Sequence, residues 1–327
     1  MAAAPPCRAR VVAVGGSLPE RRLTNADLER MVDTSDEWIV LRTGIRERRV
    51  VDPGSGLLPL AVAAARQCLE RAGCAPGDVD GIIAATITPD EVMPAMANRV
   101  QHAIGATRAW GYDLVNACNG FVAALSTACA FIESGRARRL LVLGGDVMSS
   151  IVDYADRNTC VLFGDGCGAV LVERGPADGP GVLGFAMHSD GGSGDDLCLP
   201  ASGSRAAPGR RRVVHQNGKV VFQHAIRRMA EVSVEVLDQL GLGGADVDLL
   251  VPHQANRRII EPTAERLGLP LDKVVINLER LGNTTGATIP LALHDAFADG
   301  RLRPGTRCLL AAFGGGFTWG ACYLVWG

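Results

Sequence analysis

The feature that most limits the fold of this chain is an internal repeat. Residues 64–86 read AARQCLERAGCAPGDVDGIIAAT, and residues 233–255 read SVEVLDQLGLGGADVDLLVPHQA. Each segment has the pattern of an amphipathic helix, a glycine-containing stop and an apolar strand. The Asp-Val-Asp triplets of the two segments begin at Asp78 and Asp246, about half the chain apart.

A second pair of segments repeats at nearly the same spacing. ESGRARRLLVLGGDVM and ADGRLRPGTRCLLAAFGGGFTWG have Gly-Arg turns that begin at Gly135 and Gly300. Two matches at nearly one offset indicate a duplicated α/β unit. The strands are continuously apolar, as strands covered on both faces should be. We therefore expect two sheets sandwiched by helices, with halves at residues 1–175 and 176–327.

The composition excludes several classes of protein. The 327 residues carry a net charge of −2, which gives no general attraction to nucleic acid or to a membrane. The first residues lack the pattern of a signal peptide, and no apolar run reaches the ~18 residues of a membrane span. Ten cysteines without a C-x-x-C pair or a His/Cys cluster favour reduced thiols in the cytoplasm over disulfides or a structural zinc site.

Two glycine-rich stretches do not fit nucleotide-binding loops. FGDGCGAVLVE leads into an apolar strand rather than a helix, so it fails the pattern of a dinucleotide site. GGSGDD lacks the Gly-Lys-Ser/Thr of a phosphate-binding loop. No nucleotide cofactor is therefore expected.

A cysteine follows a buried strand and precedes an apolar helix in DLVNACNGF. This residue, Cys118, falls at the strand-to-helix turn before a helix expected to cover about 17 residues. Free amides and the helix dipole favour a thiolate at such a position. Taken alone, the pattern leaves packing and nucleophilic roles equally open, because free cysteines are often buried.

Two polar residues of the second half lie in similar places. His253 follows a buried strand in LLVPHQANRRII, and Asn283 lies in a turn before another apolar helix in LERLGNTTGATIPLAL. Alone, each would most often be structural, the asparagine as a helix cap. Together with Cys118 they lie at strand ends or helix starts, where α/β sites gather. The three form a candidate catalytic set.

These motifs resemble the thiolase superfamily, and most closely β-ketoacyl-acyl-carrier-protein synthase III. TSDEWI, RTGIRER, FGDG, HQAN, GNT and FGGGFTWG occur in the family's order, and the resemblance covers nearly the whole chain. It implies the five-layered αβαβα thiolase fold, internally duplicated, and a homodimer.

The resemblance also implies the reaction. Cys118 would be acylated by an acyl-CoA and then attacked by the enolate of a malonyl-carrier protein as carbon dioxide leaves. The backbone amides of Cys118 and Gly315 would form the oxyanion hole, and His253 Nε2 and the Asn283 amide would stabilise the enolate. The partners would be acyl-CoA and acyl carrier protein, and no metal or redox cofactor is expected.

Further site residues carry over by motif. Each matches a position that in the family binds CoA or its pantetheine arm, the acyl chain, or the carrier protein. CoA and pantetheine would contact Trp38, Arg42, Arg157 and Asn256; the acyl pocket would contain Met93, Phe163 and Phe313; the carrier protein would dock on Arg257 and Arg258.

The sequence departs from the common pattern beside the nucleophile and in one loop. Asn116 and Asn119 flank the Ala117-Cys118 pair where small residues are commoner, and Met93 replaces a phenylalanine that in many relatives enters the partner's acyl pocket. These departures favour a polyketide-pathway relative that takes an acyl chain other than acetyl, with neutral drift as the alternative. Glu91 is a candidate base across the dimer, as in relatives that join two chains without decarboxylation.

Other classes of function were compared with this interpretation. A papain-like protease shares the Cys, His, Asn order but needs a CGSCW-type context that is absent. An acyltransferase to a hydroxyl or amine on the same fold would form no enolate, and Asn283 argues against it. A non-catalytic partner subunit would lack Cys118.

Overall fold

The computed structural model describes residues 7–200, 203–204, 209 and 211–327. The first six residues, on which part of the signal-peptide expectation depends, lie outside this range. In the part of the chain that the structure describes, no helix is long and apolar enough to cross a lipid bilayer.

Two sheets form the frame. The first has the order β1-β7-β6-β4-β5, and the second has the order β11-β12-β13-β8. The first sheet comprises β1 (Cys7–Ser17), β4 (Gly81–Ala85), β5 (Trp110–Leu114), β6 (Arg139–Val147) and β7 (Asp165–Pro176). The second comprises β8 (Gly181–Ser189), β11 (Leu249–Pro252), β12 (Arg307–Gly314) and β13 (Thr318–Val325). Two further two-stranded antiparallel sheets pair β2 (Arg22–Thr24) with β3 (Glu47–Arg49) and β9 (Leu197–Cys198) with β10 (His215–Gln216).

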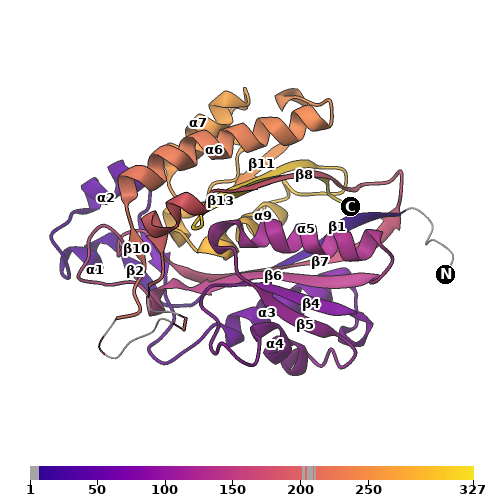
Figure 1. The fold of residues 1–327 in the computed structure, drawn as a ribbon, viewed down its shortest axis with the longest axis horizontal. Helices are drawn as coiled ribbons and strands as arrows, with labels where there is room; N and C mark the ends of the chain where they lie inside the picture. The colour runs from indigo at the N-terminus through magenta and orange to yellow at the C-terminus, as the bar shows by residue number, and fades with distance from the viewer. Residues whose placement is uncertain (1–6, 201–202, 205–208, 210) are drawn as a thin grey trace.

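Helices cover both sheets and fill the space between them, which gives five layers (Figure 1). α3 (Leu58–Ala72) and α4 (Met96–Ile104) cover the outer face of the first sheet, and α6 (Gly218–Gln239) and α7 (Arg257–Arg266) lie outside the second. α5 (Gly120–Glu133) and α9 (Thr288–Ala298) form the central layer. The remaining helices are short: α1 (Asn25–Glu29), α2 (Asp36–Thr43) and α8 (Leu278–Leu281). The predicted five-layered α/β fold is confirmed.

The central helices are apolar on most sides because sheets cover both of their faces. α5 reads GFVAALSTACAFIE, and eight of its 14 residues are buried. It is shorter than the predicted helix at both ends: Asn119 belongs to a separate 3₁₀ turn, η2 (Ala117–Asn119), and α5 ends at Glu133 with Ser134 as its C-cap. The break coincides with Ala117, whose φ of 45° lies in the left-handed region that a helix does not use.

The duplication is visible in detail. β4 precedes β11 by the same number of positions as β6 precedes β12, and this offset is also the one between the two Asp-Val-Asp triplets. Asp80 and Asp248 make the same bond in each half: each carboxylate accepts the backbone N–H of the arginine that opens the neighbouring strand, at 3.0 and 2.9 Å. The left-handed residues repeat at the same offset, at Ala117 (φ 45°) and Thr285 (φ 49°).

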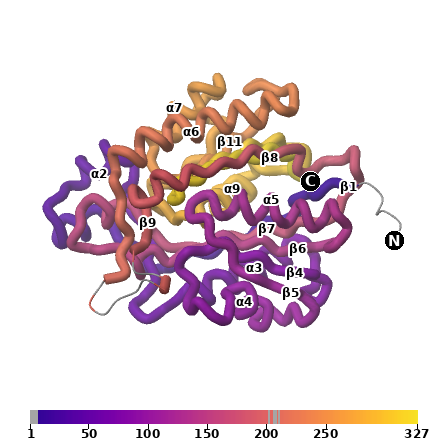
Figure 2. The backbone as a smooth tube through the Cα atoms, viewed as in Figure 1, coloured from indigo at the N-terminus to yellow at the C-terminus, as the bar shows by residue number. Residues whose placement is uncertain are grey.

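The halves are not separate in space. The strands of the first sheet lie within residues 7–176 and those of the second within 181–325. α5 and α9 nevertheless contact strands of both sheets. Figure 2 shows β1 and the C-terminus on the same side of the molecule, and the N–H of Gly327 donates to Val11 O at 3.4 Å. The division into domains at 175/176 stays a prediction.

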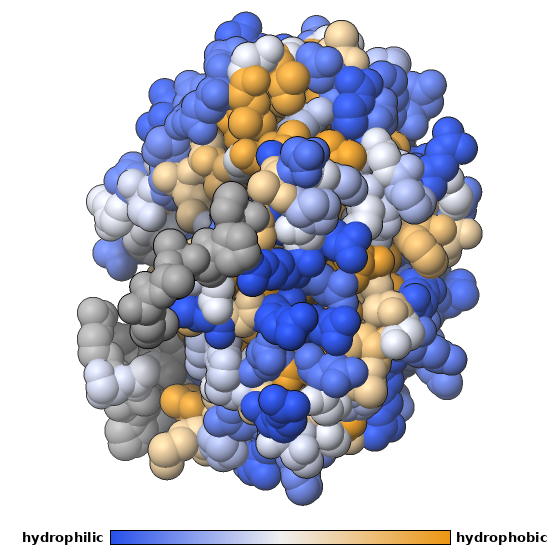
Figure 3. Space-filling model, turned by 90° about the vertical axis from the view of Figure 1, so that its right-hand side faces the viewer, coloured by the Kyte–Doolittle hydropathy of each residue, from blue (hydrophilic) through white to orange (hydrophobic). Residues whose placement is uncertain are grey.

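A buried arginine joins the β2–β3 strand pair to the loop before β7, whose residues Leu162 and Phe163 line the cavity described below. The Arg48 guanidinium donates to Leu23 O, Asn25 Oδ1 and Val161 O at 3.2, 2.8 and 2.7 Å. The side chain is fully buried, and burial lowers its pKa to about 10. Three oxygens thus hold a cation that would otherwise be costly to bury. On the face drawn in Figure 3, hydrophilic residues predominate, with smaller apolar patches between them.

Candidate active site

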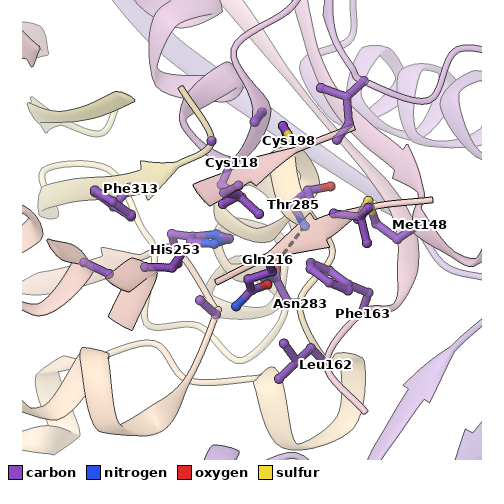
Figure 4. A pocket seen from close by; sticks show the side chains of 18 of the residues that line it. Cys118, Met148, Leu162, Phe163, Cys198, Gln216, His253, Asn283, Thr285 and Phe313 are labelled. Atoms are coloured by element: carbon purple, nitrogen blue, oxygen red, sulfur yellow. Dashed lines mark hydrogen bonds between the residues drawn. The ribbon is translucent and has the colours of Figure 1, made fainter. Parts of the chain in front are cut away.

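One large cavity, of about 1030 Å³, brings the predicted catalytic set together. Cys118, His253 and Asn283 all line it, although they come from three separate loops (Figure 4). Cys118 lies between β5 and α5, His253 follows β11, and Asn283 precedes α9. The sequence expectation that strand ends and helix starts would meet at one site agrees with this placement.

Cys118 is held by a turn that leaves almost no free space. It lies in η2, directly after the left-handed Ala117, and is only 7% exposed. The end of β12 presses against it: a Cβ on Gly314 would lie 2.8 Å from both the Cβ and the backbone N of Cys118. Glycine at 314 therefore allows β12 to bring the neighbouring Gly315 amide to the sulfur.

His253 is buried at the end of β11 with its orientation fixed on one side of the ring. Its Nδ1 lies 2.7 Å from Thr288 Oγ1, and its backbone N–H donates to Ala311 O at 2.7 Å. The adjacent Gln254 holds the loop, because its Nε2 donates to Pro252 O and Val275 O at 2.8 and 2.9 Å. Nε2 of His253 is the ring nitrogen left for the cavity.

Asn283 is fixed through its backbone and through its side-chain oxygen. Its N–H donates to Leu162 O at 2.8 Å, and its carbonyl accepts from Gly164 N at 3.0 Å. Its Oδ1 accepts from Thr285 N at 2.9 Å (Figure 4). The two N–H groups of the amide are therefore directed away from that bond and are available to a ligand in the cavity.

A buried carboxylate that sequence reasoning missed supports this turn. Asp146 Oδ1 accepts from Thr86 Oγ1, Ile87 N and both groups of Thr88 at 2.8–3.2 Å. Its Oδ2 accepts from Thr285 Oγ1 and from Gly286 N, the latter at 3.2 Å. The sequence signal was present, since an aspartate ends the otherwise apolar strand RLLVLGGDV.

Burial decides the protonation of the site. It raises the pKa of the Cys118 thiol to about 12, with the charge of Asp146 acting in the same direction and the amides of Cys118 and Gly315 opposing it. It also lowers the pKa of His253 to about 3. The resting pair is therefore a neutral thiol and a neutral imidazole. The expectation of a thiolate stabilised by the helix terminus is wrong for this state, because desolvation outweighs the amides.

The residues predicted for CoA and carrier contacts divide into two groups. Trp38, Arg42, Asn256 and Arg258 line the cavity. Arg157 does not line it but places its guanidinium over the Trp38 ring, 5.0 Å from the centroid. Arg257 also lies outside the lining and pairs instead with Glu261 of its own helix at 2.7 Å.

The residues predicted for the acyl pocket also divide. Phe163 and Phe313 line the cavity, as does Gly315, which was predicted for the oxyanion hole. Met93 does not, and is 86% exposed. Glu91, in the same loop, pairs with Arg99 at 2.5 Å on the surface. Any role of Met93 or Glu91 in an active site therefore requires a second chain.

Comparisons with known proteins agree on one family. The family model described as 3-Oxoacyl-[acyl-carrier-protein (ACP)] synthase III matches residues 112–191, and its C-terminal counterpart matches residues 237–326. The Beta-ketoacyl-[acyl-carrier-protein] synthase III of Koribacter versatilis is 46% identical over 327 residues, which cover 98% of each chain.

Solved structures give the same result. The 3-oxoacyl-[acyl-carrier-protein] synthase III of Aquifex aeolicus VF5 has a TM-score of 0.92 at 41% identity, covering 97% of this chain and 100% of that one. The priming beta-ketosynthase of the R1128 polyketide biosynthetic pathway also has a TM-score of 0.92, at 36% identity, covering 99% and 98%.

The buried histidine predicts a pH dependence of stability. In the unfolded chain His253 takes up a proton near pH 6.5, whereas the folded pKa is lowered to about 3. Between these values the unfolded state binds one more proton, so the free energy of unfolding should fall as pH falls, by up to about 1.4 kcal/mol per pH unit. Urea unfolding at pH 7, 6 and 5 would measure this slope. His253→Gln should have the shallower slope, and equal slopes would contradict the prediction.

Proposed function

This chain belongs to the 3-oxoacyl-[acyl-carrier-protein] synthase III family of condensing acyltransferases, and we propose that Cys118, His253 and Asn283 carry out its reaction. The observation that supports these roles is that one cavity is lined by all three, two of them with a fixed orientation. The reaction is a decarboxylative Claisen condensation, which joins an acyl group from acyl-CoA to a malonyl-carrier protein and initiates chain synthesis.

The first half-reaction moves the acyl group to Cys118. The sulfur attacks the thioester carbonyl, and the carbonyl oxygen becomes an oxyanion while the tetrahedral intermediate exists. The backbone N–H groups of Cys118 and Gly315 both point to the sulfur, and they are the donors for that oxygen. The carbon–sulfur bond to CoA then breaks, and an acyl-cysteine remains.

The second half-reaction makes the new carbon–carbon bond. Loss of carbon dioxide from the malonyl thioester leaves its electron pair as an enolate, which attacks the acyl-cysteine carbonyl and expels Cys118 as a thiolate. The thiolate takes up a proton from solvent and returns to the neutral thiol, which replaces the proton that left with CoA. The enolate oxygen needs a donor, and Asn283 supplies an amide whose orientation is fixed by its bond to Thr285. His253 faces the same space (Figure 4). Every electron pair is accounted for without a metal or redox cofactor.

The outer part of the cavity fits the long arm of CoA or of a carrier protein. Trp38 offers a ring for the adenine, with Arg157 already against it. Arg42 and Arg258 line the same region, and arginine binds phosphate through two parallel hydrogen bonds. We place carrier docking on Arg258, with Arg257 as a flanking charge. A cytoplasmic location is part of this proposal, supported by ten cysteines that are all free thiols.

A homodimer is the assembly that we propose. β5 is the edge strand of the first sheet, and among the described residues no strand pairs with its outer edge. Val115, which follows β5, is 76% exposed, and Val92 and Met93, in the loop before α4, are 85% and 86% exposed. Large exposed apolar residues beside a free strand edge favour a protein partner. A second copy would cover them and would bring Met93 to an acyl pocket.

A polyketide-priming synthase is the second candidate function. Asn116 and Asn119 beside the nucleophile favour it, and the R1128 enzyme shows that the fold includes such a member. Its chemistry is the same, and only the acyl group and the carrier differ. Joining two chains without decarboxylation has less support, because Glu91 pairs with Arg99.

Loading experiments test the roles directly. The protein would be incubated with acyl-CoAs from acetyl to long-chain, its intact mass read, and malonyl-carrier protein then added. We expect the mass of one acyl group on the wild type and none on Cys118→Ala. Asn283→Ala should still load but should condense about 10²–10³ times more slowly. Acetyl or short branched loading would indicate fatty acid initiation, and preference for another starter would indicate polyketide priming. Loading of Cys118→Ala would refute the nucleophile.

The close contact at Gly314 predicts a large effect of one methyl group. In Gly314→Ala the new Cβ would lie 2.8 Å from the Cys118 backbone, so the turn must shift. Displacement of about 1 Å costs up to about 10²-fold in rate, and we expect acyl loading to slow by at least about 10-fold. Gly191→Ala is the control, because a Cβ there meets nothing within 4 Å. Equal loading by both variants would contradict the close approach.

The dimer is tested by a charge beside the strand edge. Val115→Glu should convert a two-chain particle to a single chain, because the carboxylate would be buried without a partner. Leu271→Glu introduces the same charge at a half-exposed residue of another surface and should leave the assembly unchanged. Light scattering after size-exclusion chromatography measures the mass. A wild type that elutes as one chain would refute the homodimer.

A further inference from the structure

The hydroxyl of Thr288 connects the catalytic histidine to the turn that holds Asn283. Thr288 is buried in the first turn of α9, and its Oγ1 has two close neighbours. One is His253 Nδ1 at 2.7 Å, and the other is the carbonyl oxygen of Thr285 at 3.0 Å. A hydroxyl has one proton, so it donates to one of these neighbours and accepts from the other.

The carbonyl determines which neighbour receives the proton. A carbonyl oxygen can only accept, so the contact at 3.0 Å is a hydrogen bond only if Thr288 donates to Thr285 O. Thr288 must then accept from His253, and the ring nitrogen at 2.7 Å must carry a hydrogen. The opposite arrangement would turn a lone pair of the hydroxyl toward the carbonyl oxygen.

Thr285 connects this pair to a second anchor of the turn. Its backbone carbonyl accepts from Thr288, and its side-chain hydroxyl donates to the buried Asp146 Oδ2. The carbonyl that accepts from Thr288 is therefore held in place. Thr285 also gives its N–H to Asn283 Oδ1, so this one left-handed residue orients both polar groups of the site.

We propose that Thr288 is a positioning residue that keeps the proton of His253 on Nδ1 and leaves a lone pair on Nε2, in the cavity that Cys118 also lines. This inference rests on the proposed function and states which ring nitrogen of His253 accepts the proton in that reaction. During acyl loading, the thiol proton moves to Nε2 as the sulfur bonds to the acyl carbon. When the bond to CoA breaks, the CoA sulfur takes that proton, and the ring returns to its first form.

The assignment changes one sequence expectation. Nε2 was expected to donate to the enolate, but a ring with its single proton on Nδ1 cannot donate from Nε2. In the condensation step Asn283 is then the donor that is always available, and His253 donates only while it carries a second proton. The ring with this tautomer can therefore accept a proton during acyl loading, but it can donate one during condensation only after it has been protonated a second time.

The test reads the tautomer directly. The full chain would be labelled with ¹⁵N-histidine, and the His253 signals would be assigned by their loss in His253→Gln. We expect Nδ1 to show the shift of a protonated nitrogen and Nε2 that of an unprotonated one, in the resting protein without substrate. A protonated Nε2 would overturn the proposal whatever the activity. A protein with the expected tautomer that is not acylated by acyl-CoA would refute the proposed function instead.

Variants separate this role from a merely structural one. Thr288→Val keeps the volume but removes the hydroxyl, so we expect acyl loading at least about 10-fold slower and a changed tautomer, against the ~10²–10⁴-fold that general acid–base catalysis contributes. Thr288→Ser restores the hydroxyl and should keep both the rate and the tautomer. Thr263→Val is the matched control, because Thr263 makes the same kind of bond inside α7, to Ile259 O at 2.9 Å.

Each outcome decides the proposal. A Thr288→Val protein with the wild-type rate and tautomer would overturn it, and so would a Thr288→Ser protein that loses the tautomer. Should Thr288→Val fail to fold, the wild-type spectrum and the serine variant still give the answer. An equal loss of rate in Thr263→Val and Thr288→Val, with no change of tautomer in either, would show that only helix packing is affected.

Discussion

The structure of the site depends on the carboxylate of Asp146. It is fully buried, and no described cation pairs with it; six hydrogen bonds hold it instead. Four come from residues that follow β4 in the first half, and two come from the turn before α9 in the second. A buried charge that is satisfied from two directions fixes both partners, because moving either one would leave it short of donors. The same charge works against ionisation of Cys118, so the support has a chemical cost.

The duplication explains why the two halves meet so closely there. Asp146 and Gly314 are equivalent positions in the two halves, near the ends of β6 and β12. Asp146 contacts the turn at Thr285 and Gly286, and Gly314 contacts the turn at Cys118. Each strand end therefore supports the turn of the other half. Asp146 supports its turn through hydrogen bonds, whereas Gly314 allows a close backbone approach because it has no side chain.

The sequence predicted the frame of the fold, and the residues that meet in the cavity, better than the contacts that support them. The constant offset between the repeated segments and the apolar strands were sufficient for the fold, and motifs placed Cys118, His253 and Asn283. An aspartate at the end of an apolar strand was a signal for Asp146, but the partners of Asp146 and Thr288 could not be predicted, because these contacts join residues 139 and 35 positions apart. The thiolate expectation failed for a related reason: burial, which outweighs the helix terminus, is a property of the folded surroundings. Met93 stays a prediction because any acyl pocket that it enters would belong to another chain.

The repeated left-handed turn has a consequence for how such a site can change. Ala117 and Thr285 are equivalent positions in the two halves. The residue after each lies against a strand end of the other half: Cys118 against the end of β12, and Gly286 against the end of β6. Two copies of one scaffold thus line a single cavity, but they contribute different residues. The first half contributes Cys118, and the second contributes His253 and Asn283. A substitution in the turn of one half must therefore fit the strand end of the other half, so the tolerance of each turn is decided by residues about half the chain away.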